Sequence, residues 1–162
     1  MNSFEFAINM ELEGEKFYRN QAELNHGSGL ETVCLILAND EKRHAEILTE
    51  KAKSKDWALE DGHDLKKEDS IFHGLDDLKS DIRKTPTQLD FYREASHNEK
   101  ISIDLYKGYL AKATSDNDKE LFEYLVKQEE NHFNMLDDLA GMLTHAEEWV
   151  EDAEFGIRKE EY

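Results

Sequence analysis

The sequence predicts an all-α protein, a four-helix bundle built from two antiparallel helical hairpins that a long crossover joins. Three observations support this prediction. The 162 residues contain one proline, and residues of high helix propensity such as Glu, Lys, Leu and Ala are abundant, which favours long uninterrupted helices. Apolar residues recur with the helical period and show no strand-like alternation. Short turns join the first and last pairs of helical segments, whereas about thirty residues separate the middle pair, enough to travel the length of a bundle.

The first hairpin is expected over residues 2–54. Its first helix opens with a capping box, in which Asn2 and Glu5 each satisfy the other's backbone N–H group. A glycine-rich turn follows. The second helix opens with a similar pair, Ser28 and Glu31, so we expect a second capping box there.

The crossover over residues 55–84 is polar and mixed, with a short helix expected near 75–82. Thr85 and Pro86 then fit the N-cap and the first helical position, where proline is tolerated. The third helix is expected to end near Ala113. Because the crossover is long, the second and third helices can run parallel.

A polar turn at 114–118 precedes the fourth helix, which we expect to end near Leu143. We therefore divide the chain into a bundle over residues 1–145 and a short C-terminal tail over 146–162, with room in the tail for one more short helix.

The chain repeats itself at an offset of 88 positions, with residues 4–52 matching 92–140. General likeness between amphipathic helices explains matched Leu and Ala, but it hardly explains matched Glu, His and Tyr together. We infer two copies of one hairpin, related by a pseudo-two-fold axis. The identical polar and aromatic pairs are Glu11 with Glu99, Tyr18 with Tyr106, Glu41 with Glu129, and His44 with His132.

One glutamate lies in the middle of the apolar stripe of each predicted helix: Glu11, Glu41, Glu99 and Glu129. The first two are equally far from the first turn, and the last two are equally far from the last turn, so all four are expected at one level of the bundle. Unpaired buried carboxylates are very costly, so these four require compensating cations.

A histidine follows three residues after two of these glutamates, as His44 after Glu41 and His132 after Glu129. Positions i and i+3 project to one side of a helix. A lone histidine on an apolar face is more often a hydrogen-bonded core residue than a ligand. Two of them, level with four core glutamates, favour a metal site instead, and its oxygen-rich ligands suit iron or manganese better than zinc or copper.

Four glutamates and two histidines in this arrangement are the ligand set of ferritin-like di-iron and di-manganese carboxylate proteins. The chain resembles the rubrerythrin-like branch of the ferritin-like superfamily over nearly all of residues 2–143. The segments that carry the resemblance are ELEGEKFY at 11–18, EKRH at 41–44, EKISIDLY at 99–106 and EENH at 129–132.

The resemblance implies a ferritin-like bundle that holds two iron ions per chain, with manganese as the alternative metal. Glu41 and Glu129 would bridge the two ions. The terminal ligands would be Glu11, Glu99, His44 and His132.

The resemblance also implies roles for residues beside the ligands. Tyr18 and Tyr106 would donate hydrogen bonds to ligand carboxylates, unless they only fill the core. Asp40 and Gln128 precede the two bridging glutamates. They either orient the imidazoles of the opposite hairpin or form a partly exposed flank.

Two departures from the rubrerythrin pattern bear on activity. A single cysteine, Cys34, cannot supply the rubredoxin domain of full-length rubrerythrins, so electrons must come from a separate donor protein; we expect the thiol to be a buried apolar filler. Rubrerythrins also tend to carry an extra carboxylate one turn after the third-helix ligand. Ser102 stands there, and Gly14 is its counterpart in the first helix.

The leading functional hypothesis is a di-iron oxidoreductase that reduces peroxide or dioxygen in oxidative-stress defence. The alternatives are a ferroxidase or iron-binding protein without peroxidase turnover, and a metal-free helical interaction module. The net charge of −18 argues against a nucleic-acid surface. Because the sequence has no apolar run of membrane-spanning length and no signal-peptide pattern, we expect a cytoplasmic protein. We also expect a homodimer, since exposed apolar patches usually mark interfaces.

Overall fold

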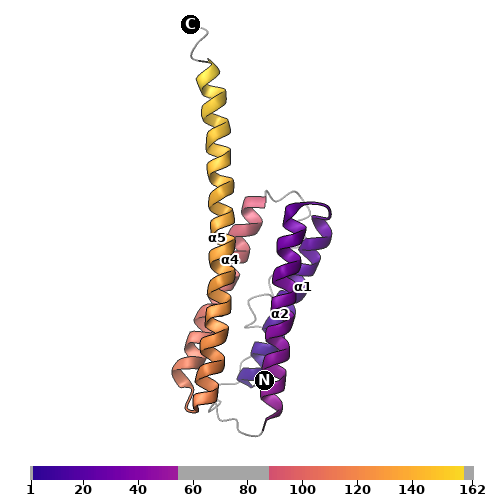
Figure 1. The fold of residues 1–162 in the computed structure, drawn as a ribbon, viewed down its shortest axis with the longest axis vertical. Helices are drawn as coiled ribbons and strands as arrows, with labels where there is room; N and C mark the ends of the chain where they lie inside the picture. The colour runs from indigo at the N-terminus through magenta and orange to yellow at the C-terminus, as the bar shows by residue number, and fades with distance from the viewer. Residues whose placement is uncertain (1, 55–87, 159–162) are drawn as a thin grey trace.

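The computed structural model describes residues 2–54 and 88–158. Within these ranges the chain is helical apart from its turns and contains no strand, which confirms the predicted all-α bundle (Figure 1). Among the described helices, none combines the length and the apolarity that a bilayer crossing needs. The helices are α1 (Ser3–Leu24), α2 (Gly29–Lys53), α4 (Gln88–Lys112) and α5 (Asp116–Arg158).

The helices pair as predicted, α1 with α2 and α4 with α5, each pair antiparallel (Figure 1). The ring of Phe17, near the end of α1, stacks on that of Phe91, near the start of α4, with the ring centroids 5.9 Å apart. The start of α4 therefore lies at the same end of the bundle as the start of α2. Helices α2 and α4 run parallel, as the long connection predicts.

The capping box at the start of α1 is confirmed. The side-chain oxygen of Asn2 accepts hydrogen bonds from the backbone N–H groups of Phe4 and Glu5, at 3.1 and 2.8 Å. The Glu5 carboxylate in turn accepts from the backbone N–H of Asn2 at 3.1 Å. These bonds satisfy N–H groups that have no partner within the helix.

The second predicted capping box, at the start of α2, is wrong. Ser28 occupies the N-cap position, but its hydroxyl donates to the backbone oxygen of Asn25 at 2.7 Å instead of capping the helix. Glu31 accepts from the backbone N–H of Gly27 at 2.7 Å. Gly27 has a left-handed backbone in this turn, with φ of 82°. The Ser28 and Glu31 side chains therefore bond backbone groups of residues before the helix, instead of capping each other's N–H groups.

The fourth helix is longer than predicted. It begins at Asp116, inside the expected turn, and continues to Arg158, so the predicted end near Leu143 is wrong. The residues after Leu143 include good helix formers and no proline, so nothing in them stops a helix. Helix α5 therefore projects well beyond the other three (Figure 1). The division of the chain after residue 145 stays a prediction, and the predicted helix at 75–82 and the cap at Thr85 and Pro86 lie outside the described residues.

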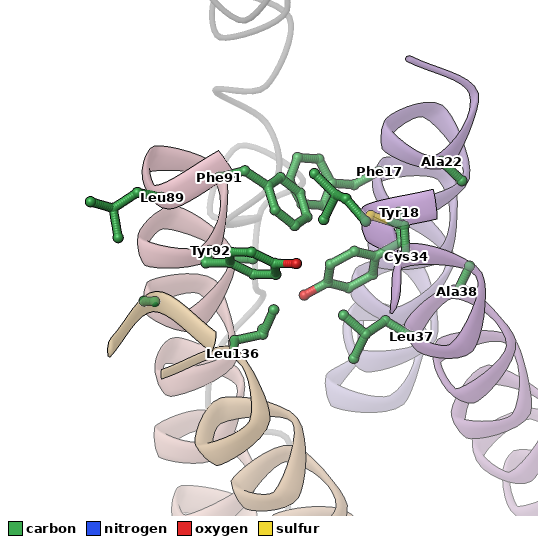
Figure 2. Close-up of a cluster of buried hydrophobic side chains, with 13 residues drawn as sticks. Phe17, Tyr18, Ala22, Cys34, Leu37, Ala38, Leu89, Phe91, Tyr92 and Leu136 are labelled. Carbon is green, nitrogen blue, oxygen red and sulfur yellow. The ribbon is translucent and has the colours of Figure 1, made fainter. Parts of the chain in front are cut away.

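The apolar core consists of two clusters, one toward each end of the bundle. Figure 2 shows the first, where Phe17 and Tyr18 of α1 face Phe91 and Tyr92 of α4. The second gathers around Phe122, which packs against Phe4 of α1 with the ring centroids 6.0 Å apart. The level at which the four glutamates are expected falls between the two clusters.

Cys34 lies in the first cluster and its side chain is fully buried, as predicted (Figure 2). Burial in this apolar environment raises the pKa of the thiol to about 12. The thiolate, which is the reactive form, is therefore strongly disfavoured in the folded protein.

We predict that a thiol reagent such as 5,5′-dithiobis(2-nitrobenzoate) reacts with folded protein at pH 8 far more slowly than with protein unfolded in guanidinium. Absorbance at 412 nm measures the reaction. Equal rates for folded and unfolded protein would show that the thiol is accessible.

The raised pKa of Cys34 also makes stability depend on pH. The contribution of the buried thiol to the free energy of unfolding is complete below the unfolded pKa of about 8.5, and it is lost as the pH rises toward 12.

An ion pair joins the two hairpins near the start of α5. The Lys51 ammonium of α2 lies 3.2 Å from the Asp118 carboxylate of α5, and Asp118 is completely buried. At the positions related by the internal repeat the chain carries Leu139 and Leu30, which belong to the first apolar cluster. The repeat is therefore broken here, with a charge pair at one end of the bundle and apolar packing at the other.

Replacing Lys51 by methionine leaves a buried carboxylate without its cation, and we expect the free energy of unfolding to fall by about 3 kcal/mol. Changing Asp118 to leucine in the same chain should restore most of this loss, since both charges are then absent. Urea unfolding followed by circular dichroism measures both variants. If Lys51→Met costs no more than an exposed substitution such as Lys53→Met, the ion pair contributes nothing to stability.

Candidate metal centre

The four glutamates expected at one level are all buried in the structure. They come from the four helices, Glu11 from α1, Glu41 from α2, Glu99 from α4 and Glu129 from α5, and none is more than 5% exposed. Their positions on the apolar stripes carry them inward, as the helical period requires. They form a carboxylate layer between the two apolar clusters.

The carboxylate layer and the two buried histidines, His44 and His132, form two groups of potential metal ligands. Within each group one ligand atom per residue lies within 4.8 Å of every other. Glu41 and Glu129 belong to both groups. We call the first group (Glu11, Glu41, His44 and Glu129) the His44 position, and the second (Glu41, Glu99, Glu129 and His132) the His132 position.

Each histidine presents its Nδ1 atom to the carboxylates. His44 Nδ1 lies 2.9 Å from Glu129 Oε1 and 3.3 Å from Glu11 Oε2. His132 Nδ1 lies between three carboxylates, 3.3 Å from the nearest oxygen of Glu41 and 3.5 Å from that of Glu129, with Glu99 at 3.7 Å. The two imidazole rings are stacked with their centroids 5.6 Å apart.

Several of these buried atoms have no hydrogen-bond partner despite the short distances. They are Oε2 of Glu11, both carboxylate oxygens of Glu129, and Nδ1 of His44 and of His132. Buried polar atoms in proteins are nearly always hydrogen-bonded, so atoms that crowd together without hydrogen-bond geometry need another partner. Lone pairs that converge from three carboxylates and one imidazole suit a cation at their centre, so this donor set fits a metal ion at each position.

Electrostatic interactions within the carboxylate layer shift the pKa values of its members in opposite directions. Burial, followed by the charge of Glu129, raises the pKa of Glu99 to about 8. Burial and the neighbouring carboxylates likewise raise the pKa of Glu41 well above its ordinary value. Burial alone would lower the pKa of His44, but Glu11 and Glu129 outweigh it and raise this pKa to about 10.

The same physics acts on the other two members of the layer. Burial opposes ionisation of Glu129, but the two adjacent histidines outweigh it and hold its pKa below the ordinary value. The carboxylates beside His132 raise its pKa despite the opposing effect of burial. Protons on these groups and divalent cations are alternative ways to balance four buried carboxylates, so metal binding at this layer releases protons.

Two tyrosines form hydrogen bonds to Glu11 and Glu99 across the interface between the hairpins. Tyr18 of α1 donates a hydrogen bond to Glu99 of α4, and Tyr106 of α4 donates one to Glu11 of α1. These are the bonds that the family resemblance implies, and the role of the tyrosines beside metal ligands stays a prediction. Burial, followed by the nearby carboxylates, raises the pKa of each phenol well above its ordinary value, which keeps both tyrosines protonated as donors.

Asp40 and Gln128 behave differently although they occupy equivalent positions. Asp40 Oδ2 lies 3.0 Å from His132 Nε2 and accepts a hydrogen bond from it, so Asp40 contacts the imidazole of the opposite hairpin, which is one of the two roles left open for it. This bond lowers the pKa of Asp40 despite partial burial. Gln128 is half-buried and makes no hydrogen bond to His44 within the described part of the chain.

The structure explains what Gly14 does, which the sequence did not. A Cβ atom at this position would lie 3.3 Å from Glu41 Oε2, tighter than an ordinary contact. Glycine therefore leaves room for the Glu41 carboxylate. Ser102, its counterpart, is buried and donates to the backbone oxygen of Asn98 at 3.3 Å.

The family model described as Rubrerythrin matches residues 2–140, which include all six candidate ligands. The chain belongs to the rubrerythrin family. Its fold is similar to that of a Thermotoga maritima protein described as ferritin-like and diiron-carboxylate, with a TM-score of 0.70 and 25% sequence identity over 86% of this chain and 95% of that one. A comparison with curated proteins finds no match. The rubrerythrin family and the two buried Glu/His groups together indicate di-iron binding.

A metal ion that binds the folded bundle and not the unfolded chain must stabilise it. With one ion at a hundred times its dissociation constant, we expect the thermal midpoint to rise by about 5–10 °C. Calorimetry of metal-free protein with Fe(II) under nitrogen, or with Mn(II), measures this shift. Glu129→Gln keeps the shape of the side chain but removes the negative charge that both metal positions share, so it should abolish most of the rise in the thermal midpoint. The exposed substitution Glu123→Gln should not. A shift of the same size in Glu129→Gln would place the metal elsewhere.

Proposed function

We propose that this chain is a di-iron oxidoreductase that reduces peroxide or dioxygen. The observation that carries the proposal is the pair of buried ligand groups that share Glu41 and Glu129. Two groups with common carboxylates can hold two ions side by side, which a two-electron reduction requires. Glu41 and Glu129 would bridge the ions. Glu11, Glu99, His44 and His132 would be the terminal ligands.

A pair of ferrous ions supplies, when bound, the two electrons that reduce a peroxide with two protons to two molecules of water. The chain's own residues orient the ligand carboxylates and exclude water from the metal site. Tyr18 and Tyr106 hold the outer carboxylates from the opposite hairpin. Gly14 leaves room for the Glu41 carboxylate, which would bridge the two ions. The apolar clusters above and below keep bulk water from the layer.

Iron oxidation without peroxidase turnover is a second candidate, and Ser102 favours it. Rubrerythrins tend to carry an extra carboxylate at this position. In this chain the position holds a buried serine, whose hydroxyl bonds the backbone oxygen of Asn98 and lies close to the Met10 sulfur. A metal-free interaction module is disfavoured, because the buried atoms of Glu129 and both histidine Nδ1 atoms have no hydrogen-bond partner.

The proposed chemistry also needs an electron donor. The single cysteine of this chain is buried and cannot form a rubredoxin-type iron site, so we propose a separate donor protein. A lone reduced thiol is also consistent with a cytoplasmic location. The homodimer stays a prediction.

Protein purified without chelators should contain about two iron atoms per chain, and the reduced form should be reoxidised by peroxide. Elemental analysis and stopped-flow absorbance measure these properties. The double variant Glu41→Ala/Glu129→Ala should lose both the metal and the reaction. Its matched control is Glu46→Ala/Glu123→Ala, which removes two exposed carboxylates from the same helices.

The oxidant separates the two functions. Faster reoxidation by peroxide than by dioxygen, repeated over many cycles with a reductant present, supports the oxidoreductase. Reoxidation by dioxygen alone, with ferric iron retained and no further turnover, supports iron oxidation instead. A protein that refuses added Fe(II) and Mn(II) would contradict both.

A further inference from the structure

The two metal positions differ in what holds their histidines. Asp40 and Gln128 are related by the same offset of 88 residues as the ligands themselves. His132 Nε2 donates to Asp40 at 3.0 Å. In the described ranges, no carboxylate or amide takes the equivalent place beside His44 Nε2.

This difference decides which nitrogen of each ring carries the proton. A carboxylate only accepts hydrogen bonds, so the bond to Asp40 keeps the neutral ring's proton on Nε2 and leaves a lone pair on Nδ1. That lone pair faces Glu41 and Glu129. The bond to Asp40 therefore fixes the orientation of the His132 ring before any metal arrives, and it reserves Nε2 for a proton so that Nδ1 is the nitrogen left for a metal ion. His44 also presents Nδ1 to the carboxylates, but no hydrogen bond among the described residues holds its Nε2 proton or its ring in the same way.

The two metal positions are alike in their ligand sets and in the hydrogen bonds to their terminal glutamates. Each has three carboxylates and one imidazole, and two of the carboxylates are common to both. The terminal glutamate of each accepts a hydrogen bond from a tyrosine. The space beside Gly14 affects Glu41, which serves both positions equally. Asp40 is thus the difference that acts on one position alone.

We propose that the His132 position binds a divalent cation more tightly than the His44 position and fills first, with Asp40 as the positioning residue responsible. This inference rests on the proposed function in that it requires two metal ions at the carboxylate layer. Carboxylate partners of metal-bound histidines typically contribute 10- to 100-fold to metal affinity, so the two affinities should differ by about this factor.

Calorimetric titration of the metal-free full-length chain with Co(II) alone tests the proposal, with the visible absorption of Co(II) as a second readout. The wild type should bind two ions in two resolved steps. Asp40→Asn should weaken the tight step about tenfold or more and leave the weak step in place. Asp138→Asn, which removes an exposed charge from α5, is the matched control for long-range electrostatics.

Single-histidine variants identify the step that belongs to each position. His132→Ala should remove the tight step, and His44→Ala the weak one. In the exchanged variant Asp40→Gln/Gln128→Asp the order should reverse, so that His44→Ala then removes the tight step. A purely structural role for Asp40 would weaken both steps together and would not be reversed by the exchange.

The outcomes separate this inference from the proposed function. Two ions bound with equal affinity, or a tight step unchanged in Asp40→Asn, would overturn the inference and leave the di-iron proposal standing. Binding of no Co(II), Fe(II) or Mn(II) by the wild type would overturn both. Circular dichroism of each variant confirms that it is folded, which is expected of Asp40 variants because this side chain is 40% exposed.

Discussion

The structure depends on the burial of four carboxylates in one layer of an otherwise apolar bundle. The two apolar clusters pack above and below this layer, and each supplies the burial that raises the pKa of Glu41 and Glu99. Removing carboxylates from water is costly unless they are neutralised and hydrogen-bonded. Tyrosines, histidines, protons and cations are the means available. Folding and cation binding are therefore parts of one equilibrium in this protein.

The balancing groups come from across the interface between the hairpins. Tyr18 of the first hairpin bonds Glu99 of the second, and Tyr106 of the second bonds Glu11 of the first. Asp40 likewise reaches His132 of the other hairpin. Each hairpin supplies a histidine to its own carboxylates but receives its tyrosine hydrogen bond from the other, so the layer is complete only when the two dock. The site is thus also what specifies how the hairpins fit together.

The sequence predicted the carboxylate layer because a glutamate on an apolar stripe is conspicuous, and helical geometry places residues at equal distances from a turn at one level. It did not predict the Lys51–Asp118 ion pair, since both residues lie in polar segments where charges are ordinarily exposed. The cap at Ser28 failed because a motif cannot reveal how Gly27 turns the chain. The end of the last helix was missed because no residue marks a stop near 143.

An internal duplication would by itself produce two equivalent metal positions. The ligands and their tyrosines have stayed identical between the two hairpins, and the differences lie one step outward. Asp40 and Gln128 differ in charge, and farther from the ligands the Lys51–Asp118 ion pair in one half corresponds to Leu139 and Leu30 in the other. Side chains that touch a ligand change its orientation and basicity without changing the donor set. The inequivalence of the two halves therefore arises in the residues that hold the ligands, which a comparison of ligands alone would overlook.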